Sequence, residues 1–128
     1  MFRRELSRTL EERLREPRSF IQVVMGPRQT GKTTAIKQAV KAAGLPVRVA
    51  SADSAIELGA DWIELEWRQA RNMTELGAKA VLVLDEIQKV AQWSQTDKRL
   101  WDEDSWDDTP LLVILSDSSS LLIGRGLS

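Results

Sequence analysis

The stretch that decides the fold runs from residue 20 to residue 34 and reads FIQVVMGPRQTGKTT. Its first six residues are mostly apolar and stop at Gly26, which predicts a short buried strand. Apolar residues then recur at helical spacing over residues 31–43, so the strand passes through a tight turn into a helix. The helix should end at Gly44, because glycine accepts the left-handed conformation of a C-cap and Pro46 prevents continuation.

The turn between strand and helix, GPRQTGKT, has the spacing of a P-loop. Its two glycines let successive backbone N–H groups point into one concavity, and the helix N-terminus adds further donors. Lys32 is expected on the β- and γ-phosphates of a nucleotide, and the Thr33 hydroxyl on Mg²⁺. A chance match is the alternative, but the flanking strand and helix are the context that the motif requires. We therefore expect ATP and Mg²⁺ to bind here. The residues expected to contact the nucleotide are Gly26, Pro27, Arg28, Gln29, Thr30, Gly31, Lys32, Thr33 and Thr34.

The rest of the chain continues the alternation of strands and helices. A helix is expected over residues 6–14, ended by Pro17. After the P-loop helix we expect a strand at 47–49 that closes on 51–53, and then capping boxes at Ser54…Glu57 and Asp61…Glu64 with a helix through 62–69. A loop at 72–77 and a strand at 80–84 should follow, and the next helix should start at Ser94 with Asp97. The last predicted elements are a solvated acidic loop at 102–108, a strand at 111–115 and a helix from Ser116. This order predicts right-handed crossovers and a mostly parallel sheet with helices on both faces, a three-layer α/β/α fold.

Composition limits the chemistry that is open to the chain. Its 128 residues, 42% of them apolar, fit one folded domain over residues 1–128. There is no cysteine and no histidine, so a disulfide framework, thiolate chemistry and a histidine base are excluded. No apolar run approaches a membrane span, and the N-terminus lacks the apolar core of a signal peptide. We expect a cytoplasmic protein without a membrane partner.

Charge is unevenly distributed along the chain. The first fifty residues carry 11 Lys and Arg against 4 Asp and Glu, and the remainder carries 7 against 15. A basic half could attract nucleic acid or nucleotide phosphate, although interspersed charges also simply solvate helix surfaces. Neither an aromatic RNA-binding pattern nor a zinc-finger spacing supports nucleic acid, so such a partner is not established.

A pair of acidic residues, Asp85 and Glu86, follows the apolar run at 80–84. In P-loop enzymes an aspartate at the end of such a strand supports the magnesium ion. The carboxylate after it can orient an attacking water or accept its proton. A helix N-terminus that favours acidic residues is the alternative. Together with the P-loop upstream, the pair favours a hydrolytic site.

The sequence resembles a known family in four places. These are GPRQTGKTT at 26–34, LDEIQK at 84–89, WS at 93–94 with KRLWDED at 98–104, and SSSLL at 118–122 with RGLS at 125–128. They are similar to the prokaryotic AAA-type P-loop ATPases whose C-terminal half is a domain of unknown function. The resemblance implies a RecA/AAA-like P-loop NTPase core. Under it Lys32 and Glu86 are catalytic, Thr33 and Asp85 support the metal, and Ser116 senses the γ-phosphate.

The chain departs from that family in two respects. Asp117 stands where the family usually has glycine after the sensor, which would put a negative charge near the phosphates. The chain also stops at Ser128, before the fifth strand, the lid and the C-terminal domain that the resemblance implies, so we expect a partial domain. A neighbouring subunit commonly supplies an arginine to such sites. Arg125 is a candidate, and a mobile surface residue is the alternative.

Three functions remain open at this point. The first is an ATP-hydrolysing AAA-type core that acts as a homo-oligomer or with a missing C-terminal domain. The second is a nucleotide-binding fragment or remnant without significant turnover. The third is a nucleic-acid or protein adaptor with a vestigial P-loop. Glu86 favours the first, the absent C-terminal parts favour the second, and only the basic first half favours the third.

Overall fold

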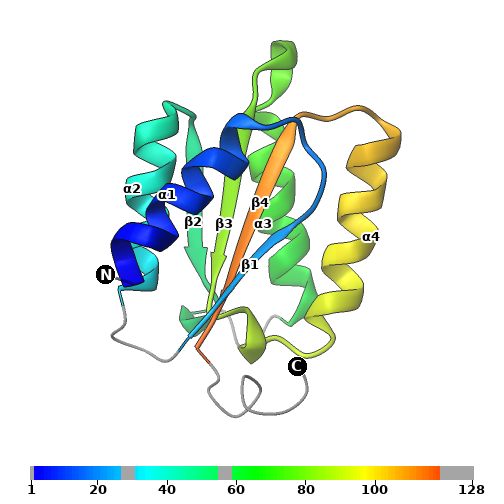
Figure 1. Ribbon diagram of the computed structural model, residues 1–128. Helices are drawn as coiled ribbons and strands as arrows, with labels where there is room; N and C mark the ends of the chain where they lie inside the picture. Colours follow the sequence, from blue (N-terminus) through cyan, green and yellow to red (C-terminus); the bar gives the residue numbers. More distant parts are fainter. Residues whose placement is uncertain (1, 27–30, 55–58, 119–128) are drawn as a thin grey trace.

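Four parallel strands form a single sheet in the order β1-β4-β3-β2 (Figure 1). The computed structural model describes residues 2–26, 31–54 and 59–118. The elements in chain order are α1 (Phe2–Arg15), β1 (Gln22–Met25), α2 (Lys32–Ala43), β2 (Val47–Ser51), the 3₁₀ turn η1 (Ala52–Ser54), α3 (Ala60–Asn72), the 3₁₀ turn η3 (Glu75–Gly77), β3 (Ala80–Asp85), the 3₁₀ turn η4 (Ile87–Lys89), α4 (Trp93–Trp106) and β4 (Leu111–Asp117).

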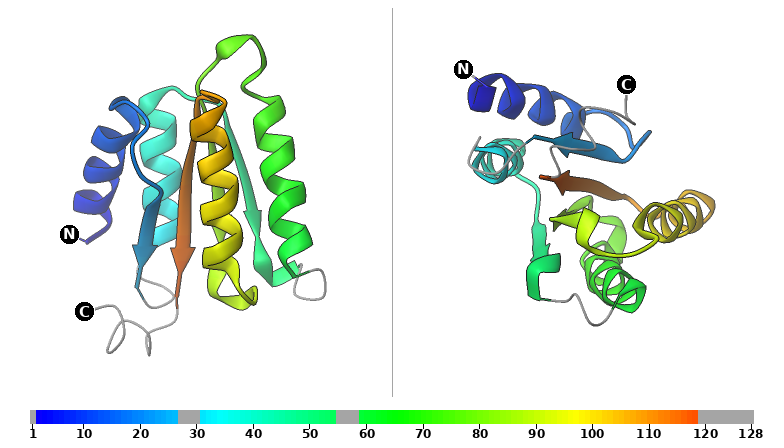
Figure 2. Two further views of the ribbon diagram at one scale, coloured as in Figure 1. Left: turned by 90° about the vertical axis from the view of Figure 1, so that its right-hand side faces the viewer. Right: turned by 90° about the horizontal axis from the view of Figure 1, so that it is seen from below.

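The sheet lies between two helical layers, with α1 and α2 on one face and α3 and α4 on the other (Figure 2). Both central strands are apolar along their length because both of their faces are covered. In β3, Val81 and Val83 pack toward α1 and α2, whereas Leu82 and Leu84 pack toward α3 and α4. The three-layer α/β/α fold expected from the sequence is therefore confirmed.

Two boundaries that frame the P-loop unit agree with the sequence. The strand before it ends at Met25, and the helix after it ends at Ala43. Gly44 has φ 72° and donates its N–H to the carbonyls of Val40 and Lys41, as the predicted C-cap should.

Among the described helices, none combines the length and the apolar composition needed to cross a bilayer.

The fourth helix differs from its prediction at both ends. It begins at Trp93 with Gln92 at the N-cap position, so Ser94 lies inside the helix and does not cap it. The acidic stretch 102–108, expected as a solvated loop, continues the helix as far as Trp106. The prediction was wrong there because charge count alone does not show that one face of this stretch packs against α3.

Three smaller expectations also need correction. Gly59 is the N-cap of α3, so Asp61 lies within the first turn and makes no capping hydrogen bond. The loop expected at 72–77 contains η3. Strand β4 continues to Asp117, so no helix begins at Ser116. The Ser54…Glu57 box and the remainder of the predicted last helix lie largely outside the described residues.

A buried carboxylate, Asp104, ties α3 and α4 to the segment that precedes β1. It accepts hydrogen bonds from Trp67 Nε1 and Arg71 Nε, each at 2.7 Å, and Nη2 of Arg18 lies 3.9 Å from it. Arg18 in turn donates to the carbonyl of Leu111 at 2.8 Å. Burial raises the pKa of Asp104, and the hydrogen bonds from Trp67 and Arg71 oppose that rise. The charge is therefore buried but well partnered.

Replacing Asp104 by alanine should lower the free energy of unfolding by about 3 kcal/mol, because the Trp67 indole N–H and the Arg71 guanidinium lose their acceptor and Arg18 loses an ion-pair partner. Asp102→Ala is the matched control on the same helix, since Asp102 forms its ion pair with the exposed Lys98 and its loss should cost less than about 0.5 kcal/mol. Urea unfolding of both variants makes the comparison. Equal losses would contradict this role for Asp104.

A second buried carboxylate, Asp97 in α4, has no such support. Its side chain is 1% exposed, and neither oxygen has a hydrogen-bond partner in the part of the chain that the structure describes. Burial raises the pKa of Asp97 from 3.8 to about 7. Below pH 3.8 both the folded and the unfolded chain carry the proton. Between pH 3.8 and 7 only the folded chain keeps it, so stability falls as pH rises through this window and is lowest above it.

The variant Asp97→Asn should lack this decline. Its free energy of unfolding, relative to that of the wild type, should rise between pH 4 and pH 8 by as much as about 4 kcal/mol, the free-energy equivalent of the pKa change. Denaturant unfolding at several pH values measures the difference. A constant difference across the window would show that Asp97 does not titrate in this way.

Candidate functional site

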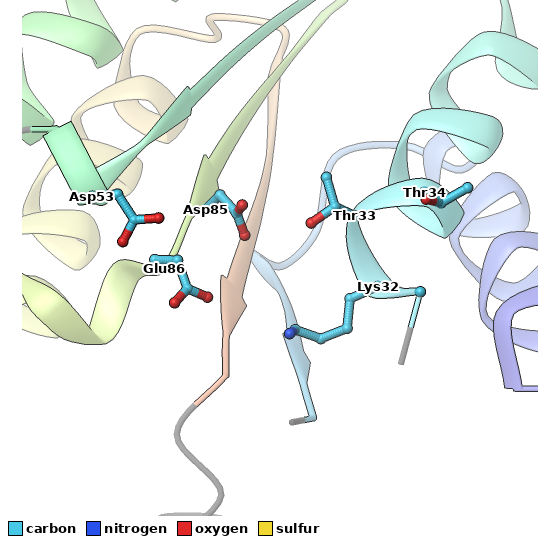
Figure 3. Close-up of a pocket in the computed structure, with 7 residues that line it drawn as sticks. Lys32, Thr33, Thr34, Asp53, Asp85 and Glu86 are labelled. Carbon is cyan, nitrogen blue, oxygen red and sulfur yellow. The ribbon is translucent and has the colours of Figure 1, made fainter. Parts of the chain in front are cut away.

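A pocket of about 350 Å³ opens at the carboxyl ends of the strands, where parallel sheets commonly bind ligands. Its wall comes from the N-terminus of α2 on one side and from the ends of β2 and β3 on the other (Figure 3). The residues that line it are Gly31, Lys32, Thr33, Thr34, Asp53, Asp85 and Glu86. Predicted phosphate, metal and catalytic positions thus share one cavity.

The P-loop is described at its two ends. Gly26 follows β1 and donates its N–H to the carbonyl of Asp117 at 3.1 Å, which fixes the start of the loop beside β4. Gly31 has φ 87° and ψ 14°, a left-handed conformation that an L side chain would strain, and α2 starts immediately after it. The predicted contacts Pro27, Arg28, Gln29 and Thr30 lie outside the described residues.

The N-terminus of α2 is suited to an anion. The first helical backbone bond that closes over it runs from Ala35 N to the Gly31 carbonyl at 2.9 Å, so the N–H groups of the preceding residues have no partner within the helix. Among the described residues no side chain caps them, and the first turn holds no acidic residue. These donors and the positive end of the helix dipole therefore lie on the pocket wall and can receive phosphate oxygens.

Lys32 and Thr33 project from this helix end toward the acidic side of the pocket (Figure 3). Lys32 is only 6% exposed, so its ammonium is held within the cavity rather than in bulk water. The hydroxyl of Thr33 faces Asp85, whereas Thr34 is exposed and points away from Asp85. Of the three, Lys32 and Thr33 are placed to act on the same bound group.

Asp85 is held in place by Ser116 of the neighbouring strand. The Ser116 hydroxyl donates to Oδ1 of Asp85 and accepts a 3.4 Å hydrogen bond from the backbone N–H of Glu86. Ser116 is completely buried and does not belong to the residues that line the pocket. Its predicted contact with a γ-phosphate stays a prediction. What its position provides is a fixed orientation of the carboxylate that faces Thr33.

Glu86 has an unusual backbone for a residue with a side chain. It has φ 57° and ψ 43°, a left-handed conformation that costs roughly 1–2 kcal/mol in a non-glycine residue. Its side chain is nearly buried and accepts a 2.8 Å hydrogen bond on Oε1 from the Ser118 hydroxyl. The turn thus carries the chain from β3 into η4 while directing the glutamate into the pocket (Figure 3).

Asp117 lies in the sheet, at the end of β4. It is the last residue of β4, fully buried, paired in register with Met25 of β1, and does not have a positive φ. It is not one of the pocket-lining residues. Its carboxylate therefore does not lie on the pocket wall.

The donor set fits a magnesium ion bound together with phosphates. Among the described residues, no three acidic side chains are grouped so as to hold a metal ion by themselves. Magnesium in nucleotide sites typically takes one or two protein oxygens together with phosphate oxygens and water. The Thr33 hydroxyl opposite the fixed carboxylate of Asp85 offers such a pair, beside a helix end suited to phosphate.

Three residues of this site were not identified from the sequence: Asp53, Lys89 and Ser118. Asp53 lines the pocket from η1, immediately after β2. Lys89 forms ion pairs with Asp53 and Glu86, and Ser118 hydrogen-bonds Glu86. Polar residues at strand ends were a usable sign for Asp53 and Ser118. Lys89 belongs to the stretch 84–89 that carries the family resemblance, but its residue type alone does not distinguish it from a solvated surface lysine.

Comparison with known proteins agrees with this geometry. A solved structure described as "Structural Basis for Katanin Self-Assembly" is similar to this chain, with a TM-score of 0.60 and 17% identity. The match covers 88% of this chain and 42% of that one, so this chain spans less than half of its length. At this identity the likeness establishes a shared fold. No curated protein matches by sequence.

The family is established by sequence. Residues 18–128, which include β1, the P-loop, Asp85, Glu86 and β4, match the family described as AAA domain. The chain belongs to the AAA domain family.

Proposed function

We propose that this domain binds Mg-ATP in the pocket at the carboxyl ends of the strands and hydrolyses its γ-phosphate. One observation carries the proposal. Lys32 and Thr33 at the N-terminus of α2 face Asp85 and Glu86 across a single cavity. The known properties of AAA domains and the fit of the residues to phosphate and magnesium support it.

The residues divide the work between binding and reaction. The N–H groups at the start of α2 and the ammonium of Lys32 hold phosphate oxygens and neutralise charge that develops on them. Thr33 and Asp85 hold Mg²⁺, which when bound supplies further neutralisation of that charge. Glu86 orients a water for in-line attack and takes up its proton. Catalysis in this scheme rests on positioning and electrostatics.

Assembly with other chains is a further part of the proposal. The similar solved structure is described as one of katanin self-assembly, and AAA-type sites commonly take an arginine from a neighbouring subunit. We propose that this domain acts within a homo-oligomer or a longer chain. Arg125, the candidate for such an arginine, lies outside the described residues.

Nucleotide binding is tested by ligand-dependent stability. Mg-ATP at about one hundred times its Kd should raise the free energy of unfolding of the wild type by about 2.7 kcal/mol. Lys32→Ala should lose most of this increment, because an ammonium in the cavity is replaced by a methyl group. Lys37→Ala is the control, since Lys37 is exposed on the same helix. If Mg-ATP leaves the free energy of unfolding of the wild type unchanged, both ATP binding and ATP hydrolysis are ruled out. The nucleic-acid or protein adaptor with a vestigial P-loop would then be the remaining function.

Turnover is tested with Glu86→Gln, which removes the base and keeps a side chain of the same shape. Phosphate release should fall about 10²- to 10⁴-fold, the usual contribution of a general base. The Kd for Mg-ATP should change little, because Glu86 holds the water and not the phosphates. Equal phosphate release by the two proteins would contradict the role of Glu86. Binding without release by the wild type would establish the binding-only module instead.

A further inference from the structure

The ammonium group of Lys89 lies between two carboxylates that come from different strands. Nζ of Lys89 forms an ion pair with Oδ1 of Asp53 and lies 3.8 Å from Oε1 of Glu86. Asp53 follows β2 and Glu86 follows β3, the two neighbouring strands whose ends form one wall of the pocket. A single lysine therefore links the end of β2 to the proposed base.

We propose that Lys89, anchored by Asp53, is a positioning residue that fixes the carboxylate of Glu86 for the attack of water. This inference rests on the proposed hydrolysis of ATP and adds to it a specific arrangement of three residues. Lys89 acts through Glu86 and has no direct contact with the nucleotide in this scheme.

Glu86 is held both by its backbone and by donors around its side chain. Its left-handed backbone starts a short turn that is closed by a 3.1 Å hydrogen bond from Lys89 N to the Glu86 carbonyl. This turn folds the lysine side chain back alongside the glutamate from which the turn starts. In the described part of the chain, the donors around Oε1 of Glu86 include the Ser118 hydroxyl at 2.8 Å, Gln88 Nε2 at 3.4 Å and Lys89 Nζ at 3.8 Å.

Of these three donors, Lys89 is the one with a positive charge. The Glu86 side chain is 6% exposed, and a carboxylate with so little access to water requires a nearby cation or several hydrogen bonds in place of the water contacts that it loses. The weak 3.4 Å contact from Gln88 and the single hydroxyl of Ser118 supply part of that requirement. Lys89 supplies the positive charge. Because its Nζ lies near Oε1 of Glu86, it also restricts rotation of the Glu86 carboxylate.

Asp53 explains why the lysine stays there. A lysine side chain has four rotatable bonds and would otherwise spread over many conformations in water. Its ion pair with Asp53 ties Nζ to the neighbouring strand end, and the Asp53 backbone is itself held by a 3.2 Å hydrogen bond from its N–H to the Ser51 hydroxyl. The position of the ammonium is thus set from β2, independently of the glutamate that it orients.

The pair is exposed enough to be removed without unfolding the chain. The side chains of Lys89 and Asp53 are 30% and 48% exposed, and ion pairs of that exposure contribute little to stability. Removing the pair should therefore change the reaction while the fold and the phosphate-binding residues stay intact. This separation makes the inference testable by kinetics.

The experiment compares turnover with Mg-ADP affinity in the purified chain and four variants. Lys89→Met keeps the aliphatic stem and removes the charge, Lys89→Arg keeps the charge, and Asp53→Asn removes the anchor. Lys98→Met is the matched control, because Lys98 also pairs with an aspartate but lies exposed on α4. Lys89→Met should lower kcat roughly ten- to a hundredfold, as misplacement of a reacting group does, and change the Kd for Mg-ADP by less than about threefold. Lys89→Arg should recover much of the lost kcat, Asp53→Asn should show a smaller loss, and Lys98→Met should show none.

Three outcomes would overturn the inference. An unchanged kcat in Lys89→Met would remove Lys89 from the reaction while leaving the proposed hydrolysis intact. Parallel losses of kcat and of Mg-ADP affinity, in both Lys89→Met and Lys89→Arg, would show a merely structural role. A wild type that binds Mg-ADP without releasing phosphate from ATP would overturn the proposed hydrolysis and this inference together, and the binding signal separates that case from the other two.

Discussion

The structure depends on one constraint, the burial of β3 and β4 on both faces. Such strands must be apolar along their length, so the chain places its polar side chains only where the strands end. Because the strands are parallel, those ends meet at one edge of the sheet. Asp85 and Ser116 are the first polar residues after the apolar runs of β3 and β4, and they join by a hydrogen bond. The pocket lies between these strand ends and the N-terminus of α2.

The same edge has an uneven distribution of charge. Three carboxylates, Asp53, Asp85 and Glu86, line the pocket opposite Lys32 and the positive end of α2. A phosphate chain with its metal ion fits between these two sides, with the anion against the helix and the cation against the carboxylates. Lys89 pairs with two residues of the acidic wall and offsets part of its charge. In this arrangement the positive side of the pocket faces the phosphates, and the acidic side faces the metal ion.

Sequence predicted the parts of this arrangement that local patterns encode. The P-loop unit, its Gly44 cap and the apolar runs of β3 and β4 depend on neighbours along the chain, so periodicity and turn residues reveal them. The acidic stretch of α4 was predicted wrongly, because the burial of Asp104 depends on α3 packing beside it. The pairing of Lys89 with Asp53 was missed for a related reason. Those residues are far apart in sequence and meet only because β2 lies next to β3 in the sheet.

The central claim is that one pocket holds the phosphates and the metal ion of a nucleotide. A crystal structure of the chain with Mg²⁺ and a non-hydrolysable ATP analogue tests it most directly. We expect phosphate oxygens in contact with Lys32 Nζ and the first N–H groups of α2, and a metal ion on the Thr33 hydroxyl on the side of Asp85. An analogue bound elsewhere, or phosphates here with the metal ion away from Thr33 and Asp85, would contradict it.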